Sequence, residues 1–166
     1  MKELKLTTLI KELEEGELSG IDRELVEAAK EMTRTSYVPY SRFHVGAAIL
    51  LDNGEIVRGS NQENAAYPSG TCAERTACYQ AGALYPDIPF RKIAVAAWSD
   101  TGKPAGHPYG HYFQESPISP CGACRQALLE YEKLAGRPVE VILYGRDRCY
   151  VFPSVASLLP FCFTEF

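Results

Sequence analysis

The sequence predicts one α/β domain in which strands alternate with helices. Its 166 residues match the ~100–200 residues of a typical domain. The apolar fraction of 46% suffices for a core, because a chain of this size buries roughly 70% of its unfolded surface. Strand-like apolar runs alternate with helical patterns, which is typical of layered α/β folds. We therefore expect residues 1–166 to form a single domain.

The first half of the chain predicts two helices and a hairpin. Residues 1–18 have apolar side chains at helical spacing, which predicts a short helix, although their charge density also suits a frayed arm. Ser19 and Asp22 resemble a capping box and precede a helix expected over roughly 21–36. A buried strand follows over 43–51, and the turn at 52–54 leads into a partner strand over 55–60.

The second half repeats the alternation. A helix is expected from Cys72 to about residue 81, where Gly82 would stop it. Residues 93–98 predict a short strand, and a long loop follows over about 99–119. Pro120 opens a helix that runs to about 135, and a buried strand covers 139–144.

Charge and hydropathy exclude two classes of partner. The net charge is −4, and no basic stripe is present, so we expect no nucleic-acid partner. The longest apolar run covers only residues 45–51, whereas a membrane span needs ~20 residues, so we expect no membrane partner. The charged first eighteen residues leave no apolar stretch for a signal peptide. We therefore expect a cytoplasmic protein.

Two of the six cysteines lie three residues apart in a Cys-x-x-Cys motif. Thiols stay reduced in the cytoplasm, so metal binding or catalysis is the sharper interpretation. Cys121 and Cys124 lie one helical turn apart at a predicted helix start, where the helix dipole favours thiolates. An isolated cysteine is more often a small core residue. We keep that interpretation for three others, namely Cys78, Cys149 in a late turn and Cys162 in the tail.

A second motif completes a catalytic pattern. Cys72 lies at another helix start and supplies a third thiol, and a catalytic zinc needs three protein ligands and an open position. Glu74 supplies the base that a zinc-activated water requires. Cys-x-Glu followed by Pro-Cys-x-x-Cys matches the known signature of zinc deaminases. A structural zinc or redox module remains the rival from another class, but it would not need Glu74.

Four segments resemble the small homotetrameric cytidine deaminases. They are residues 40–48 (YSRFHVGAA), 61–68 (NQENAAYP), 71–75 (TCAER) and 120–124 (PCGAC). The likeness extends from about Ile21 to Phe163. It implies a three-layer α/β/α fold around a mixed sheet of about five strands. It also implies a homotetramer, because residues 158–163 resemble a C-terminal segment that reaches a neighbouring active site in that family.

The resemblance assigns a role to each site residue. It implies one zinc per chain on Cys72, Cys121 and Cys124, with Glu74 as the proton shuttle. The implied substrate contacts are Phe43, Asn61, Glu63 and Ala73. The arginines after the ligands, Arg75 and Arg125, are expected to donate hydrogen bonds to the thiolates and draw charge from them. Without the resemblance, Asn61 and Glu63 would be ordinary loop residues and the arginines solvated charges.

The implied reaction is hydrolysis of cytidine and 2′-deoxycytidine to uridine and 2′-deoxyuridine, with release of ammonia in pyrimidine salvage. A deaminase of a related cytosine nucleoside such as blasticidin S is the nearest alternative. A deaminase of bases in nucleic acid is disfavoured by the net charge.

Two segments depart from the family. Residues 1–18 form an N-terminal extension, and about 102–115 form a loop insertion rich in aromatic and histidine residues. The insertion is expected either to cover the pocket or widen its choice of substrate, or to serve as a surface or subunit contact. His107 and His111 have the spacing of a helical zinc pair, but Pro108 and Gly110 argue against a helix. His44 is expected to be a structural histidine.

Overall fold

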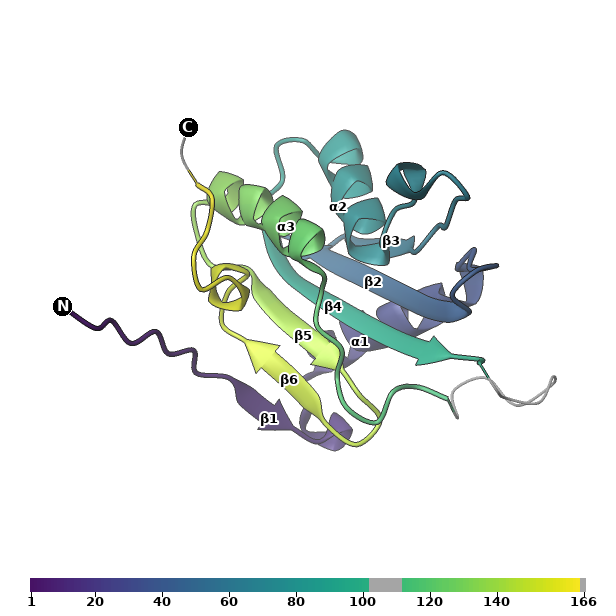
Figure 1. Ribbon diagram of the computed structural model, residues 1–166, viewed down its shortest axis with the longest axis horizontal. Coiled ribbons are helices and arrows are strands. Elements are labelled where there is room, and N and C mark those ends of the chain that lie inside the picture. The colour runs from purple at the N-terminus through teal and green to yellow at the C-terminus, as the bar shows by residue number, and fades with distance from the viewer. Residues whose placement is uncertain (102–111, 165–166) are drawn as a thin grey trace.

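The computed structural model describes residues 1–101 and 112–164 and is built on one six-stranded mixed sheet (Figure 1). The strand order is β1-β6-β5-β4-β2-β3. The strands are β1 (Lys11–Leu13), β2 (Phe43–Leu51), β3 (Ile56–Ser60), β4 (Phe90–Ser99), β5 (Glu140–Tyr144) and β6 (Cys149–Phe152). β4 and β5 are parallel, and the other neighbouring pairs are antiparallel. The sheet is mixed as expected, with one strand more than the five expected.

Helices cover both faces of this sheet. α2 (Ala73–Leu84) and α3 (Gly122–Ala135) lie on the front face in Figure 1, and α1 (Gly20–Met32) lies behind it. Residues of β2 alternate between the two resulting cores, because successive strand side chains point to opposite faces. Ala47 and Ile49 belong to the core that includes α2 and α3, whereas Ala48 and Leu50 belong to the core that includes α1. The three-layer α/β/α prediction is confirmed.

Glycines set how closely α2 approaches its neighbours. A Cβ on Gly59 of β3 would come within 2.4 Å of the backbone nitrogen of Ala77 in α2. Gly82 does not stop α2, contrary to the prediction, because the helix continues to Leu84. A Cβ at Gly82 would come within 2.3 Å of the Tyr131 hydroxyl of α3. This glycine therefore permits close packing of α2 on α3.

Some predicted element boundaries agree with the structure and others differ by a few residues. The hairpin of β2 and β3 is confirmed. α3 ends at Gly136, whose φ of 65° is the left-handed conformation that glycine adopts readily. α1 ends at Met32, and residues 33–35 form a short 3-10 turn where the prediction continued the α-helix. β4 begins earlier than predicted, at Phe90.

The N-terminal helix prediction is wrong. Residues 11–13 form β1, which pairs with β6 so that Lys11 lies opposite Val151. The prediction also placed Cys149 in a turn, but Cys149 is the first residue of β6 and is fully buried. Strand pairing between the two ends of the chain decides both cases over the local pattern. Within the described residues, no helix has the length and apolarity needed to cross a bilayer.

Candidate active site

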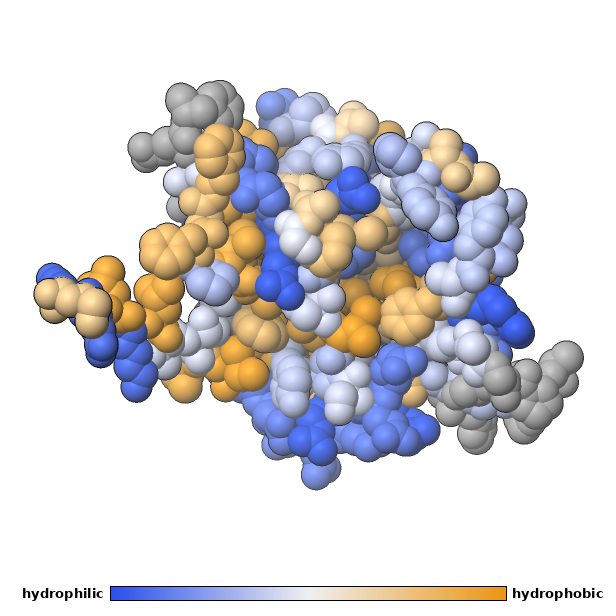
Figure 2. Space-filling view, in the orientation of Figure 1, coloured by the Kyte–Doolittle hydropathy of each residue, from blue (hydrophilic) through white to orange (hydrophobic). Residues whose placement is uncertain are grey.

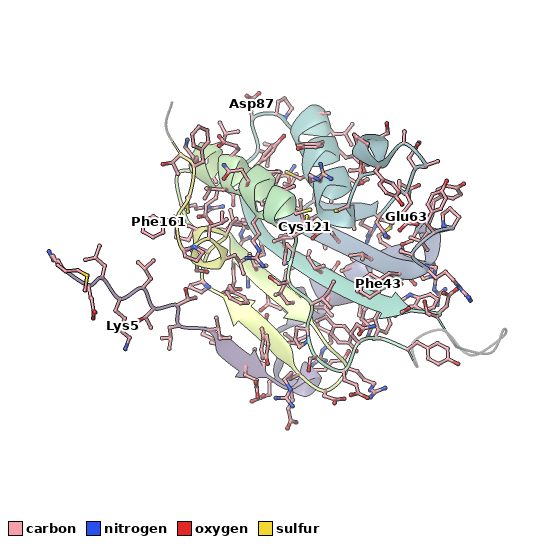
Figure 3. The ribbon with its side chains drawn as sticks, in the orientation of Figure 1. Lys5, Phe43, Glu63, Asp87, Cys121 and Phe161 are labelled. Atoms are coloured by element: carbon pink, nitrogen blue, oxygen red, sulfur yellow. The ribbon has the colours of Figure 1, made fainter. Side chains whose placement is uncertain are left out.

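The three predicted metal-binding cysteines meet where α2 and α3 begin. Cys72 and Cys121 are the residues that precede the first turns of these helices, and Cys124 lies in the first turn of α3. The Sγ atoms are 3.9 Å apart for Cys72 and Cys121 and 3.4 Å apart for Cys121 and Cys124. All three sulfurs lie within 4.8 Å of one another. Figure 3 labels Cys121 at the start of α3.

This geometry fits a tetrahedral zinc ion. Zn–S bonds of about 2.3 Å at tetrahedral angles place sulfurs about 3.8 Å apart, close to the observed separations. Three thiolates also leave one of the four zinc positions open, as a catalytic site requires. Cys121 is exposed and Cys72 is half-buried, so the open side of the cluster faces solvent. The donor set therefore suits zinc.

Neighbouring groups favour thiolate formation at Cys72. A hydrogen bond from the Cys124 thiol lowers the pKa of Cys72 to about 5, and the Arg75 guanidinium adds to this effect. The negative charge on Cys72 in turn raises the pKa of Cys124, together with burial. A divalent cation among the sulfurs would remove this mutual opposition and allow all three to ionise.

Glu74 lies in the first turn of α2 and has almost no contact with solvent. Only 4% of the residue is exposed, and this burial raises the pKa of its carboxyl to about 7. A carboxyl group with a pKa near neutrality can both accept and release a proton, as a proton shuttle must. The preceding residue, Ala73, is fully buried.

The two predicted arginines have different partners. Arg75 Nη2 lies 4.0 Å from Cys72 Sγ, which agrees with the expected contact to a ligand sulfur. Its Nε is buried and has no hydrogen-bond partner among the described residues. Arg125 instead donates to Pro120 O at 2.7 Å, to Leu158 O at 3.0 Å and to Ser119 Oγ at 2.8 Å. These bonds fix the turn before Cys121 to the C-terminal segment.

A cavity of about 580 Å³ opens beside Cys72. Most of its lining comes from the loop after β3, and its members are Tyr40, Ser41, Asn61, Gln62, Glu63, Asn64, Tyr67, Gly70, Thr71, Cys72 and Arg75. The predicted ribose contacts Asn61 and Glu63 therefore line the same cavity as Cys72. Most lining residues are uncharged, the exceptions being Glu63 and Arg75, and the volume lies within the range of small-molecule sites.

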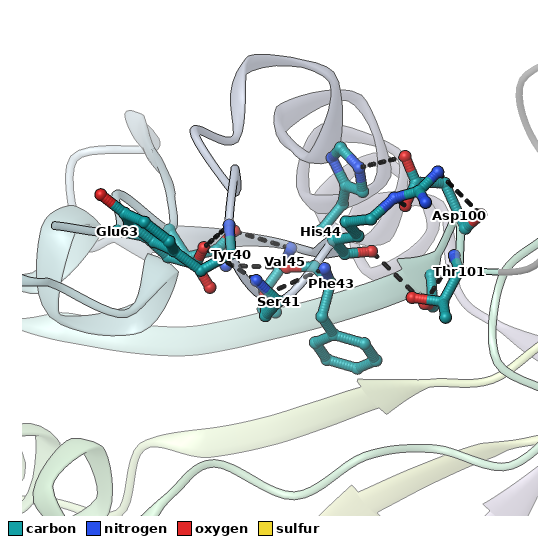
Figure 4. Close-up of polar contacts among 11 residues, drawn as sticks. Tyr40, Ser41, Phe43, His44, Val45, Glu63, Asp100 and Thr101 are labelled. Atoms are coloured by element: carbon teal, nitrogen blue, oxygen red, sulfur yellow. Dashed lines mark hydrogen bonds and ion pairs between the residues drawn. The ribbon is translucent and has the colours of Figure 1, made fainter. Parts of the chain in front are cut away.

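Backbone groups hold the two predicted ribose contacts. Glu63 Oε2 accepts from the backbone nitrogens of Tyr40 at 3.1 Å and Ser41 at 3.2 Å, as Figure 4 shows. Although burial opposes the shift, hydrogen bonds from Ser41 and Tyr40 lower the pKa of Glu63, so it is ionised. Asn61 Oδ1 accepts from Val45 N at 2.9 Å, and its Nδ2 donates to Phe43 O at 2.9 Å.

Phe43 and His44 point to opposite sides of β2 (Figure 4). Phe43 packs against the core below α2 and α3 and does not line the cavity. The His44 ring stacks on Trp98 with centroids 4.0 Å apart, and its Nε2 lies 3.8 Å from Asp100 Oδ2. His44 therefore packs as a structural histidine, as expected.

The loop insertion is described only from residue 112 onward, and His107 and His111 lie outside the described residues. Phe113 is buried in the core on the α1 side and bridges to Trp98 of β4. This end of the insertion thus packs against the face of the sheet opposite α2 and α3. Cys78 is fully buried, and Cys162 packs at the edge of the same core, as expected for core cysteines.

Seven lining residues had no role assigned from the sequence, namely Tyr40, Ser41, Gln62, Asn64, Tyr67, Gly70 and Thr71. All of them except Gly70 lie within the segments that carried the family resemblance. Their position in the sequence next to assigned site residues could have identified them as lining residues.

Comparison with known proteins agrees with this geometry. The sequence model described as “cytidine and deoxycytidylate deaminase zinc-binding region” matches residues 19–135, which include all three cysteines and Glu74. The chain belongs to this family. It is accordingly a zinc-dependent hydrolytic deaminase, and zinc is its cofactor.

Individual relatives extend the similarity over most of the chain. Cytidine deaminase from Halalkalibacterium halodurans is 37% identical over 145 residues, which cover 87% of this chain and 96% of the relative. The crystal structure of cytidine deaminase from Burkholderia pseudomallei superimposes with a TM-score of 0.68 at 36% identity, covering 88% of this chain and 100% of the other. Blasticidin-S deaminase from Bacillus cereus is 28% identical over 150 residues, or 89% of this chain and 96% of the relative.

Proposed function

We propose that this deaminase converts cytidine and 2′-deoxycytidine to uridine and 2′-deoxyuridine with release of ammonia. The observation that carries the proposal is the convergence of three cysteine sulfurs and a buried carboxyl group beside a nucleoside-sized cavity. The similarity to cytidine deaminases over most of the chain supports the same substrate. Pyrimidine salvage is the process that such a reaction serves.

The proposed zinc ligands are Cys72, Cys121 and Cys124. Zinc, when bound, supplies an activated water for attack at C4 of the pyrimidine. Glu74 accepts the proton of that water and delivers it to ring N3. It then takes the proton of the new C4 hydroxyl and passes it to the amino group, so that the C4–N bond breaks, ammonia leaves and the C4 carbonyl forms. Arg75 donates to Cys72 and withdraws charge from its sulfur.

The sugar is held at the other end of the cavity. Glu63 Oε2 accepts hydrogen bonds from the backbone nitrogens of Tyr40 and Ser41. Its other oxygen, Oε1, is the proposed acceptor of a hydrogen bond from a ribose hydroxyl. Asn61 retains one amide hydrogen and one carbonyl lone pair beyond its bonds to β2. Phe43 and Ala73 do not line this cavity, and their proposed contacts to the base rest on the family resemblance alone.

A substrate panel tests this proposal. A site that bonds sugar hydroxyls can reject an analogue without them by ~10⁴-fold, so free cytosine should be a very poor substrate. Cytidine monophosphate should also react poorly, because its phosphate adds negative charge near Glu63 and no basic pair lines the described cavity. Comparable kcat/KM values for cytidine, cytosine and the monophosphate would contradict the ribose assignment.

Glu63→Ala sharpens the panel. Loss of the carboxylate should weaken cytidine turnover and leave the slow reaction of cytosine nearly unchanged, so the gap between the two narrows. Equal losses on both compounds would show that Glu63 acts only through the fold.

Blasticidin S is the alternative substrate, because its deaminase from Bacillus cereus also aligns with most of this chain. Side-by-side ultraviolet assays with cytidine and blasticidin S distinguish the two. A higher kcat/KM for blasticidin S would replace cytidine as the preferred nucleoside.

We further propose that the protein is cytoplasmic, since a reducing compartment keeps the three thiols available to zinc.

We also propose that the protein is a homotetramer, in which the C-terminal tail contacts a neighbouring subunit. Phe161 is 83% exposed, and apolar side chains gather near the chain ends at the left of Figure 2. Within one chain the tail is tied to α3, because Gln126 Nε2 donates to Phe163 O at 2.9 Å. Removal of residues after Pro160 should lower activity. Sedimentation of an active monomer would contradict the tetramer.

A further inference from the structure

We propose that Gln62 is a positioning residue that holds the ribose contacts at a fixed distance from the metal cluster. The inference rests on the proposed nucleoside substrate and assigns a specificity role to a residue that lies between the two ribose contacts. Gln62 is flanked by Asn61 and Glu63, and it lines the same cavity.

The backbone of Gln62 joins the ribose segment to the first cysteine. Gln62 N donates to Thr71 O at 2.8 Å, and Thr71 N donates to Gln62 O at 2.9 Å. Thr71 directly precedes Cys72, which begins α2. The ribose segment and the chain that carries Cys72 and Glu74 are therefore hydrogen-bonded to each other at a single residue pair.

The segment after α1 pairs on the other side. Tyr37 N donates to Asn61 O at 3.0 Å, and Glu63 N donates to Tyr37 O at 2.8 Å. Residues 37, 62 and 71 thus form a short three-stranded bridge outside the main sheet. Gln62 is its central member.

The side chain of Gln62 fixes this bridge in place. Its Nε2 donates to Thr35 O at 3.2 Å and to Ser60 Oγ at 3.0 Å. Ser60 Oγ also accepts from Thr35 Oγ1 at 2.9 Å. Ser60 is only 4% exposed, so its hydrogen bond to Gln62 is partly shielded from water although Gln62 itself is exposed.

This anchor determines where the neighbouring side chains lie. Side chains alternate in extended backbone, so a residue held on one side directs its two neighbours to the other. Fixing Gln62 to Thr35 and Ser60 therefore keeps Asn61 and Glu63 together on the opposite side. Displaced ribose contacts weaken the binding only of substrates that carry the sugar hydroxyls, so the anchor should matter most for substrates that carry a ribose.

The test compares Gln62→Met with wild type on cytidine and cytosine. Methionine keeps the length of the side chain but donates no hydrogen bond. KM for cytidine should rise roughly 3–10-fold, while kcat and zinc content stay nearly unchanged. kcat/KM for cytosine should change less than about twofold, so the ratio of cytidine to cytosine falls.

Ser60→Ala provides a second, smaller change in the same network. It should lower the same ratio, and the effects of the two changes should be less than additive in the double variant, because both remove the hydrogen bond between Gln62 Nε2 and Ser60 Oγ. Gln80→Met is the matched control, since Gln80 is exposed on α2. It should leave both substrates unchanged.

Two results separate failure of this inference from failure of the proposed function. If wild type deaminates cytidine but Gln62→Met and Ser60→Ala change cytidine and cytosine equally, or change neither, Gln62 does not position the ribose contacts. If wild type with its full zinc content does not deaminate cytidine, the proposed substrate is wrong and the inference is lost with it.

Discussion

The two faces of the sheet are held together by different kinds of contact. On the face covered by α2 and α3, the reacting groups belong to two short sequence motifs, one at the start of each helix. On the α1 face, Lys30 joins segments from distant parts of the chain. Its Nζ lies 3.0 Å from Glu15 Oε1 and 4.8 Å and 5.7 Å from the ring centroids of Tyr144 and Phe113.

This difference separates chemistry from stability. Side chains on the α2 and α3 side can be changed to remove the reaction while the sheet and α1 retain their packing. Substitutions on the α1 side should lower the free energy of unfolding and leave the folded molecules active.

The largest expected effect is that of Cys72→Ala. Loss of one thiolate should release the zinc and reduce deamination to background, and stability should fall as well, because ligand bonds contribute folding energy. Metal analysis and an activity assay on the same sample check this. Cys78→Ala is the control, since Cys78 is buried in the same helix but outside the cluster. Full zinc content in the Cys72 variant would exclude Cys72 as a ligand.

Glu74→Gln should remove the chemistry and keep the metal. Glutamine preserves the shape of the side chain but cannot carry a proton, so kcat should fall at least ~10²–10⁴-fold. Zinc content should remain at the wild-type value. A variant that keeps a substantial fraction of the wild-type rate would exclude Glu74 as the proton shuttle.

Phe113→Ala should act on stability alone. Phe113 is 3% exposed and meets the Tyr144 ring edge-on with centroids 5.4 Å apart, so its removal leaves a cavity and costs ~3–5 kcal/mol. Denaturant unfolding measures the loss. Activity per mole of bound zinc should be unchanged at temperatures where the variant is folded, and a matching fall in that activity would show that the two faces are coupled.

Lys30→Met should have the smallest effect, about 0.5–2 kcal/mol from the lost ring contacts. Although burial opposes it, hydrogen bonds to Glu27 and Glu15 raise the pKa of Lys30. A raised folded-state pKa means that the contribution is present in full below the unfolded pKa of about 10.4 and is lost as the pH rises through the folded value. The difference in unfolding free energy between wild type and variant should therefore be constant from pH 6 to about pH 9. A difference that disappears within this range would contradict the assignment to the charged lysine.

The reacting groups were predictable because their positions are encoded locally. A cysteine just before a helix and a glutamate in its first turn require only that the helix forms, and the predicted starts at Cys72 and Pro120 lie within two residues of the observed starts of α2 and α3. The hairpin of β2 and β3 was predictable for the same reason, since its turn lies between the two strands.

The remaining features depend on contacts between distant segments. β1 was missed, and residues 1–18 were expected to form a helix or a frayed arm, because the pairing of β1 with β6 joins opposite ends of the chain. The family resemblance placed Arg125 on a ligand sulfur. Its guanidinium instead donates to Pro120 O, Ser119 Oγ and Leu158 O, and Leu158 belongs to a segment that only the fold brings to α3. The bridge at Gln62 likewise needs three segments that only the fold brings together.

The most direct measurement follows deamination of cytidine as zinc is removed and returned. The purified protein should contain one zinc per chain, lose activity in proportion to the zinc that a chelator removes, and regain it when zinc is added back. Activity that persists in zinc-free protein, or a requirement for two zinc ions per chain, would contradict a reaction built on the three cysteines and Glu74.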